Sequence, residues 1–341
     1  MPKRLEPIKL FKLIELVNME KAIKKSSLSI SENGLEKKTS SKRLEVLKTY
    51  KIYIGGQFPR TESGRYYIPT NAAGKKLANV CLSSRKDFRD AVVAARGAVS
   101  GWSGRSAFNR SQILYRMAEM LEGRKAQFID ELIQQDATKA KAEKEVNLAI
   151  DRLIYYAGWC DKFQQIFSAV NPVASSHFNF SVPEPTGVVS IIAPQSDLSA
   201  GRQGSLLGLV SVIAPVIAGG NTCIVLASET KPLCSVTFAE VLNSSDLPGG
   251  VVNILTGKPS ELASWFVDHM DVNAMIYCEN NDETKKMIRE KSALNLKRIT
   301  FYDKINWYTN EGQSPYFIMD TQEIKTTWHP VENIAGAGGG Y

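Results

Sequence analysis

The pattern of apolar and polar residues divides the second half of the chain into alternating strands and helices. Five short runs are apolar at nearly every position, and we expect each to be a strand: 188–193, 222–227, 251–255, 274–277 and 298–302. The segments between them have the length and apolar period of helices: 206–218, 233–243, 261–269 and 283–293. Strands that are apolar on both sides are buried on both faces. The pattern therefore predicts an α/β fold with a parallel sheet covered by helices on each side.

The first half of the chain predicts mainly helices, introduced by a short strand region. Residues 50–67 contain two apolar runs around a polar turn and predict a hairpin, and 77–81 fits a further strand. Four segments with helical apolar spacing then follow: 87–102, 109–124, 125–137 and 140–167. We expect these helices to pack beside the sheet.

Two further segments have the pattern of strands outside the main sheet. Between 168 and 185 the apolar period changes to two, which places Phe178, Phe180 and Val182 on one side of a strand. Residues 303–315 are polar and predict a loop, whereas 316–331 is rich in β-branched and aromatic residues and predicts an extended segment.

The net charge of +7 is concentrated at the N-terminus. Residues 1–50 hold twelve Lys or Arg and six Glu, whereas the other 291 residues hold 30 basic and 29 acidic residues. A basic face, the usual sign of a nucleic-acid binder, is therefore not predicted for the folded part. Residues 1–45 form a basic leader, in which 10–23 has helical spacing; we expect a docking helix on a tether, with disorder as the alternative.

The leader also bears on the compartment. Its six glutamates argue against a mitochondrial presequence, because transit peptides are poor in acids. We expect the chain in the cytoplasm, with the mitochondrial matrix as the alternative. No apolar run approaches the roughly 20 residues that a membrane-spanning helix needs. The five cysteines form no CxxC pair and the three histidines are far apart, which predicts neither a disulfide framework nor a metal site.

A set of segments, in constant order from about residue 50 to residue 302, resembles one family. The segments are YKIYIGGQF, AVVAARGAVSGWS, NRSQILYRMAEMLEGRKAQF, LIYYAGWCDKFQ, EPTGVVSIIAP, IAGGNTCIVLASETKPL, SDLPGGVVNILTG and NLKRIT. They resemble the NAD(P)-dependent aldehyde dehydrogenases. Among these, the chain is most similar to the degenerate second module of two-module aldehyde dehydrogenases and to the stand-alone relatives of that module.

The resemblance implies a domain organisation with one part missing. Family members combine a Rossmann-like NAD-binding domain, a catalytic domain and a β-arm for oligomerisation. Here the segment ending at Thr300 continues into FYDKINWYTNEGQSP and then into QEIKTTWHPV, which resembles the last arm strand. We therefore expect the catalytic domain to be absent. The expected parts are the leader 1–45, a Rossmann-type domain 46–302 interrupted by arm strands at about 168–185, a linker and C-terminal arm strand 303–331, and a flexible tail 332–341.

The residues that the family uses for catalysis are not recognisable. The nucleophile lies in a GQxC motif, whereas residues 312–315 read GQSP. Cys278 is the remaining candidate nucleophile, because it ends a predicted strand where α/β proteins bind ligands. A helix start would lower the pKa of this thiol, and Glu279 would raise it. The oxyanion Asn is missing from residues 194–197, and the Gly-rich stretch that follows favours a remodelled loop over a phosphate cradle.

Of the positions that bind the cofactor in the family, some are kept in this chain and others are replaced. The family's ribose-binding lysine corresponds to Leu226, whereas its neighbouring glutamate is kept as Glu229; Pro194 and Gly257 are the other candidate contacts. The pyrophosphate site, at a helix N-terminus in the family, corresponds to residues 278–283 and contains three carboxylates. These would repel a pyrophosphate, and Asn281 or Asp282 would cap the helix. We therefore expect no cofactor, and NAD or NADP if one binds.

Three hypotheses of function follow. The first is a non-catalytic subunit, a pseudoenzyme that acts in oligomer assembly with a full-length aldehyde dehydrogenase or with itself. It rests on the observation that the sequence keeps the arm strands, whereas the family's catalytic residues are not recognisable. The second is an NAD(P)-dependent oxidoreductase with an atypical site. The third is a structural subunit of a larger complex, anchored by the basic leader.

Overall fold

The computed structural model describes residues 46–195 and 204–331. The leader, the loop 196–203 and the tail 332–341 therefore lie outside the described residues, and so do the predictions made for them. None of the described helices is long and apolar enough to cross a membrane.

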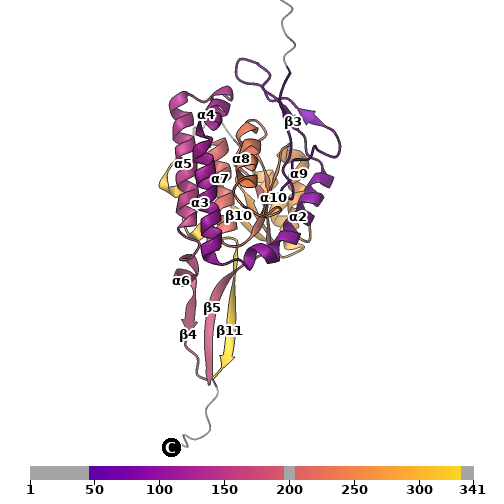
Figure 1. The fold of residues 1–341 in the computed structure, drawn as a ribbon. Helices are drawn as coiled ribbons and strands as arrows, with labels where there is room; N and C mark the ends of the chain where they lie inside the picture. The colour runs from indigo at the N-terminus through magenta and orange to yellow at the C-terminus, as the bar shows by residue number, and fades with distance from the viewer. Residues whose placement is uncertain (1–45, 196–203, 332–341) are drawn as a thin grey trace, which may run out of the picture. The chain divides into compact units, whose positions relative to one another are not determined.

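A five-stranded parallel sheet forms the centre of the fold (Figure 1). Its strands are β6 (Val188–Ile192), β7 (Thr222–Leu226), β8 (Val252–Leu255), β9 (Ala274–Tyr277) and β10 (Arg298–Phe301). Their order is β10-β9-β6-β7-β8, so β6 is central and pairs with β9 and β7. The predicted parallel sheet is confirmed, with each strand within two residues of its expected bounds.

Helices cover both faces of the sheet, as predicted. One face carries α7 (Ser205–Ala218) and α8 (Leu233–Asn243), and the other carries α2 (Arg85–Ser103), α9 (Pro259–Asp268) and α10 (Asp282–Ala293). Successive side chains of a strand point to opposite faces. Thus Val189 and Ile191 of β6 pack in the core with α7, whereas Val188 and Ile192 pack in the core with α2 and α9. This double burial explains why the strands are apolar throughout.

A second helical layer lies outside α7. It consists of α3 (Ala107–Gly123), α4 (Lys125–Gln134), α5 (Lys139–Ala157) and α6 (Phe163–Phe167), and Figure 1 shows α3 and α5 beside α7. The predicted helix over 140–167 is interrupted, because α5 ends at the cap residue Gly158 and α6 begins only at Phe163.

The hairpin predicted over 50–67 is wrong. The strands β1 (Thr49–Tyr50) and β2 (Tyr66–Tyr67) do not pair with each other; both pair with β3 (Asn79–Cys81), which lies between them. The chain leaves β1 to reach the main sheet, where Tyr53 forms an isolated bridge with Ile254 of β8. The Tyr53 side chain is buried in the main core, and this burial outweighs the local pairing that the turn around 62–64 suggested.

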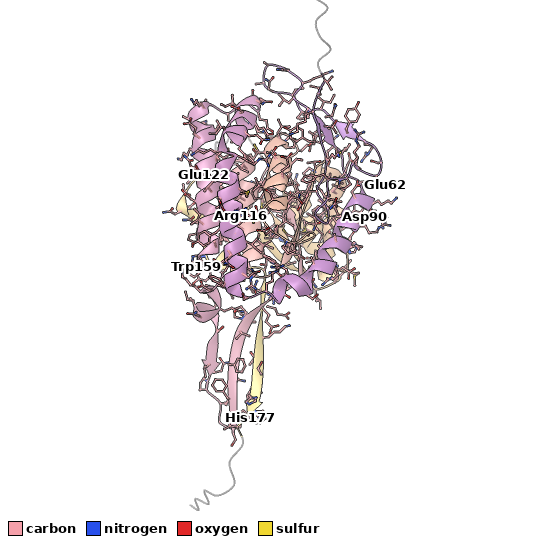
Figure 2. All side chains as sticks on the ribbon, in the orientation of Figure 1. Glu62, Asp90, Arg116, Glu122, Trp159 and His177 are labelled. Atoms are coloured by element: carbon pink, nitrogen blue, oxygen red, sulfur yellow. The ribbon has the colours of Figure 1, made fainter. Side chains whose placement is uncertain are left out.

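Three strands form a separate antiparallel sheet, which we call the arm sheet. It consists of β4 (Ala169–Asn171), β5 (His177–Pro185) and β11 (Gln322–Pro330), in the order β11-β5-β4. It extends away from the helices and the central sheet (Figure 1), and Figure 2 shows His177 at its far end. An arm built from strands before the sheet and from the C-terminal segment was expected, and the structure confirms it.

The chain passes directly from the central sheet to the arm sheet. Between β10 and β11 the structure contains the 3₁₀ helix η1 (Asn310–Gly312) and the helix α11 (Tyr316–Met319), with no further sheet. The absence of a second large domain at this point agrees with the expectation. The extended segment predicted over 316–331 needs a correction, because its first four residues are helical: α11 starts after Pro315 and buries Ile318.

Residues 303–321, which we call the covering segment, are more than the predicted polar loop. The Trp307 side chain is fully buried and packs edge-on to Tyr302 and Phe317. Its backbone carbonyl accepts a hydrogen bond from the buried guanidinium of Arg152 on α5, at 3.1 Å. The covering segment therefore closes the core next to α5 and α7.

Candidate functional site

The loops at the carboxyl ends of the central strands are where parallel α/β sheets bind ligands. Pro194 follows β6, Glu229 follows β7, Gly257 follows β8 and Cys278 follows β9, so the structure places all four predicted candidates at this edge. The backbone N–H of Glu229 donates a 2.7 Å hydrogen bond to the side chain of Gln195. This bond joins the loops after β6 and β7.

Pro194 and Gly257 lie where neighbouring elements pack closely at this edge. A Cβ atom on Gly208 of α7 would lie 2.9 Å from the ring of Pro194, so the two residues allow β6 and α7 to approach closely. Gly257 has φ of +152°, a conformation that side-chain-bearing residues rarely adopt. A Cβ there would also lie 3.3 Å from the backbone nitrogen of Ser83. Gly257 therefore has a structural reason for its identity that requires no cofactor, and Pro194 packs against α7.

Cys278 is poorly suited to act as a nucleophile. Its side chain is fully buried. Burial raises the pKa of its thiol well above the ordinary value, and the charge of Glu279 raises it further. Because the thiolate is the reactive form, such a thiol is held in its unreactive state. The other four cysteines are buried as well.

Glu279 is the most perturbed acid at the strand ends. It is mostly buried, and its Oε1 atom has no hydrogen-bond partner among the described residues. Burial, followed by the charge of Glu229, raises the pKa of Glu279 to about 7. The charge of Glu229 also adds to the effect of burial in raising the pKa of Tyr67, whose hydroxyl likewise lacks a partner in the part of the chain that the structure describes. Two carboxylates and a tyrosine thus share the region that the sequence analysis assigned to the pyrophosphate.

The N-terminus of α10 differs in detail from the expectation. Asn281 caps the helix, because its side chain accepts a 2.8 Å hydrogen bond from the backbone N–H of Thr284. Asp282 and Glu283 are exposed, so only Glu279 of the three expected carboxylates faces the interior. The sequence analysis also missed Lys285, a buried lysine whose ammonium contacts Asp303 at 2.5 Å. This ion pair lowers the pKa of Asp303 and ties α10 to the chain after β10.

A second buried group that the sequence analysis missed is Glu145 of α5. Its Oε1 accepts hydrogen bonds from the backbone N–H groups of Leu206, at 2.8 Å, and Leu207, at the start of α7. Its Oε2 accepts a 2.8 Å hydrogen bond from the hydroxyl of Tyr308. A carboxylate at this position satisfies helix N–H groups that would otherwise lack partners. The side chain of Glu145 therefore supplies the acceptor for free backbone N–H groups at the N-terminus of α7.

Comparison with known proteins identifies the origin of this architecture. The model of the aldehyde dehydrogenase family matches residues 58–327, which is most of the chain. The chain belongs to the aldehyde dehydrogenase family. The resemblance seen in the sequence is thereby confirmed for the family, while the relation to a module that lacks the catalytic domain stays a prediction.

Related aldehyde dehydrogenases are considerably longer than the matched part of this chain. The putative aldehyde dehydrogenase DhaS of Bacillus subtilis is 30% identical over 292 residues, which cover 84% of this chain and 55% of the relative. The cytosolic 10-formyltetrahydrofolate dehydrogenase of Mus musculus is 29% identical over 269 residues, or 76% of this chain and 29% of the relative. The chain thus spans about half of one relative and less than a third of the other.

Two solved structures share the fold over about half of their own length. The NAD⁺ complex of an aldehyde dehydrogenase from Bacillus cereus is 25% identical, with a TM-score of 0.68, and the match covers 78% of this chain and 52% of that one. HpcC from Thermus thermophilus is 26% identical, with a TM-score of 0.68, and the match covers 75% and 48%. NAD or NADP is thus the cofactor to test on this aldehyde dehydrogenase homologue.

The strand-end residues do not fit a dinucleotide well. Leu226, at the end of β7, is fully buried and supplies no donor to a ribose. Glu279 presents a buried carboxylate oxygen, without a partner among the described residues, where a pyrophosphate would need N–H donors. Two negative groups in a partly buried site repel each other. Leu226 and Glu279 of this aldehyde dehydrogenase homologue therefore fit a bound NAD poorly.

Proposed function

We propose that this chain is a non-catalytic aldehyde dehydrogenase subunit, a pseudoenzyme that acts in oligomer assembly through its arm sheet. Its partner is a full-length aldehyde dehydrogenase or a second copy of the chain. The observation that carries the proposal is a three-stranded sheet that projects from the core with apolar side chains exposed on both faces (Figure 2). Exposed apolar surface of this kind is typical of an interaction site.

The first face of the arm sheet is an apolar groove. In an antiparallel pair, directly opposed residues lie on the same face. Val170 of β4 is opposed to Phe180 of β5, and Phe178 and Val182 lie on the same face two residues away. Val170 is 67% exposed and Phe178 is 47% exposed. These four residues line a shallow groove that a partner would cover.

The second face and the outer edge add to this surface. Ile324 and Trp328 of β11 are 50% and 57% exposed and lie on the face opposite to the groove. The outer edge of β11 has no paired strand among the described residues. An unpaired edge can add a strand from another chain. Lys325 on this edge, paired with Glu184 at 2.8 Å, would limit unspecific pairing.

The strand-end site supports the non-catalytic part of the proposal. The thiol of Cys278 is buried and its pKa is raised well above the ordinary value, and Glu279 brings a carboxylate into the loop that the family resemblance assigns to the pyrophosphate. Neither arrangement favours thioester chemistry, which needs an accessible thiolate and donors for an oxyanion.

Size-exclusion chromatography with light scattering tests the assembly role. We expect the wild-type chain to form an oligomer with itself, or a complex with an added full-length aldehyde dehydrogenase, at micromolar concentration. The double substitution Val170→Glu and Phe178→Glu should abolish the complex by placing charges on the apolar groove. The matched control is Phe108→Glu, because Phe108 is an exposed phenylalanine on α3 and not a residue of the arm sheet. A wild-type chain that stays a monomer with either partner contradicts the proposal, as does a complex that survives the double substitution.

A second candidate function is that of an NAD(P)-dependent oxidoreductase with an atypical site. It is favoured by the similarity to a solved NAD⁺ complex and by the presence of Glu229 next to β7. A titration with NAD and NADH, followed by thermal unfolding, decides between the two candidates, because a bound ligand raises the unfolding temperature by mass action. Stabilisation that saturates at micromolar cofactor would favour the oxidoreductase. The cytoplasm remains the compartment that we predict.

A further inference from the structure

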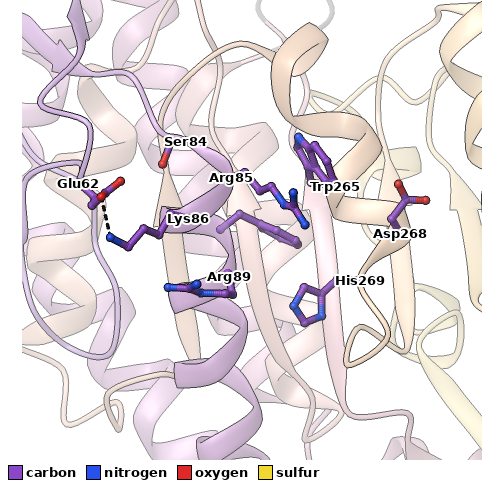
Figure 3. Close-up of a pocket in the computed structure, with 9 residues that line it drawn as sticks. Glu62, Ser84, Arg85, Lys86, Arg89, Trp265, Asp268 and His269 are labelled. Carbon is purple, nitrogen blue, oxygen red and sulfur yellow. Dashed lines mark hydrogen bonds and ion pairs between the residues drawn. The ribbon is translucent and has the colours of Figure 1, made fainter.

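A cavity of about 570 Å³ lies on the α2 and α9 side of the central sheet. It is bounded by the first turns of α2, by the turn around Glu62 and by the C-terminal end of α9 (Figure 3). None of Pro194, Glu229, Gly257 or Cys278 lines it, so it is distinct from the strand-end site. Its size lies in the range of small-molecule sites, which is roughly 300–1,000 Å³.

The inner wall of the cavity is aromatic. Phe88 of α2 is almost fully buried at its base and stacks on Phe266, with ring centroids 4.3 Å apart. The ring of His269 lies edge-on to Phe88 at 5.9 Å. The indole of Trp265 forms a further part of the wall. Trp265 and His269 are partly exposed, so their rings offer apolar surface on which a flat group can pack, next to the buried ring of Phe88.

The outer rim of the cavity is cationic. Arg85, Lys86 and Arg89, all from the first turns of α2, line it. The guanidinium of Arg85 lies over the Trp265 ring, with its carbon 4.0 Å from the ring centroid. This stacking orients the side chain through its flat face and leaves the in-plane N–H groups free to donate. No hydrogen bond or ion pair holds the Arg85 side chain within residues 46–195 and 204–331.

The two carboxylates of the cavity are already paired. Glu62 forms an ion pair with Lys86 at 2.6 Å, which Figure 3 shows on the side away from Trp265. Asp268 is paired with Lys291 of α10 at 2.5 Å. Burial lowers the pKa of His269, and nearby Arg85 contributes to this, so a neutral ring is favoured. Among the described residues, Arg85 is therefore the cation of the cavity that lacks a carboxylate partner, and Arg89 is bound only in an exposed pair with Asp90.

We propose that this cavity binds a planar aromatic acid, that is, a flat ring system that carries a carboxylate or a phosphate group. The ring packs against Trp265 and His269, both of which are partly exposed. The acid group accepts hydrogen bonds from the in-plane N–H groups of Arg85, with Arg89 as the second cation. The site goes beyond the assembly role proposed above and does not depend on it, because it lies outside the arm sheet.

Isothermal titration of the full chain with 2-naphthoate tests the site, and adenosine monophosphate serves as the phosphate-bearing probe. We expect saturable binding of at least one of the two, and the tighter of them identifies the preferred acid group. Two further probes separate the contribution of the ring to binding from that of the acid group. 2-Naphthamide keeps the ring without the charge, and inorganic sulfate keeps the charge without the ring. 2-Naphthamide should bind about tenfold more weakly than the tighter acid, because a hydrogen bond to a charged group contributes about that factor. Sulfate should also bind about tenfold more weakly, because it lacks the apolar ring surface that the cavity would bury.

Substitutions locate the ligand. Arg85→Gln removes the charge and Trp265→Leu removes the ring, and each should weaken binding of the acid about tenfold. Arg116→Gln is the matched control, because Arg116 is an exposed arginine on α3 and does not line the cavity. It should leave binding unchanged. Absence of saturable binding of both acids at millimolar concentration overturns the proposal. So does binding that is unchanged in both Arg85→Gln and Trp265→Leu, since the ligand would then lie elsewhere.

Discussion

Replacing Glu279 by glutamine should stabilise the protein, and only at neutral to alkaline pH. The pKa of this carboxyl is raised to about 7, from an ordinary value of 4.5. A raised pKa means that the folded protein binds this proton more tightly than the unfolded chain does. Stability is therefore highest below pH 4.5 and is lost as the pH rises through about 7. Glutamine cannot ionise, so the substitution avoids this loss.

The size of the effect follows from the pKa difference. At about 1.4 kcal/mol per pH unit, the rise of the Glu279 pKa corresponds to at most about 3 kcal/mol. Because the side chain is partly exposed, we expect on the order of 1–2 kcal/mol at about pH 8.5. For a chain of this size, that gain raises the unfolding temperature by roughly 1–4 °C. The gain should shrink steadily between about pH 7 and pH 4.5, where Glu279 itself becomes neutral.

Urea unfolding followed by circular dichroism at about pH 8.5, 7 and 5 measures this profile. The matched control is Glu283→Gln, which removes an exposed carboxylate four residues away at the start of α10. It should change stability by no more than a few tenths of a kcal/mol at any pH. An unchanged free energy of unfolding of Glu279→Gln at about pH 8.5 would contradict a destabilising ionisation of Glu279. A gain in the free energy of unfolding that is as large at about pH 5 as at about pH 8.5 would also contradict it, because the effect would then not come from ionisation.

Four further substitutions test other parts of the structure. Glu229→Gln should lower the pKa of Glu279 in an NMR titration, since the charge of Glu229 contributes to its rise; an unchanged pKa would exclude that contribution. Trp307→Ala should cost about 3–5 kcal/mol in urea unfolding, because the indole is fully buried; a loss below about 1 kcal/mol would mean that the covering segment is not part of the core. Gly257→Ala should cost about 1–3 kcal/mol because of its φ of +152°, and equal stability would contradict the strain. Asn281→Ala should cost about 1 kcal/mol by removing a helix cap, whereas Asn281→Asp should keep the stability.

The central sheet could be predicted because its signal is local. Strands such as β7, TCIVL, are apolar at nearly every buried position, and the helices between them keep a regular period. The arm strand β5 could be predicted for the same reason, since Phe178, Phe180 and Val182 alternate with more polar residues. The pairing of β1 could not, because its partner β3 lies far along the chain, with Thr49 opposite Asn79, and its continuation at Tyr53 reaches β8.

The candidate site was only partly predictable. The positions of Glu229, Gly257 and Cys278 follow from the strands that precede them. The burial of Glu279, in contrast to the exposure of Asp282, depends on how the loop after β9 turns, which composition does not encode. Glu145 was missed because its role arises only when α5 and α7 lie side by side. The signal that could have revealed the role of Glu145 is an acidic residue at a position where the apolar period of the helix predicts burial.

The side chain of Asn221, just before β7, has a consequence for how the subunit can be used. It donates a hydrogen bond to the carbonyl of Thr321, at 2.9 Å, and accepts one from the backbone of Gly187, at 2.8 Å. Two of the three arm strands, β5 and β11, are thereby fixed at the amino ends of the parallel strands. The strand-end loops lie one strand length away, at about 15 Å. Under the assembly role proposed above, a partner bound to the arm would therefore contact the end of the central sheet opposite to Glu229, Gly257 and Cys278.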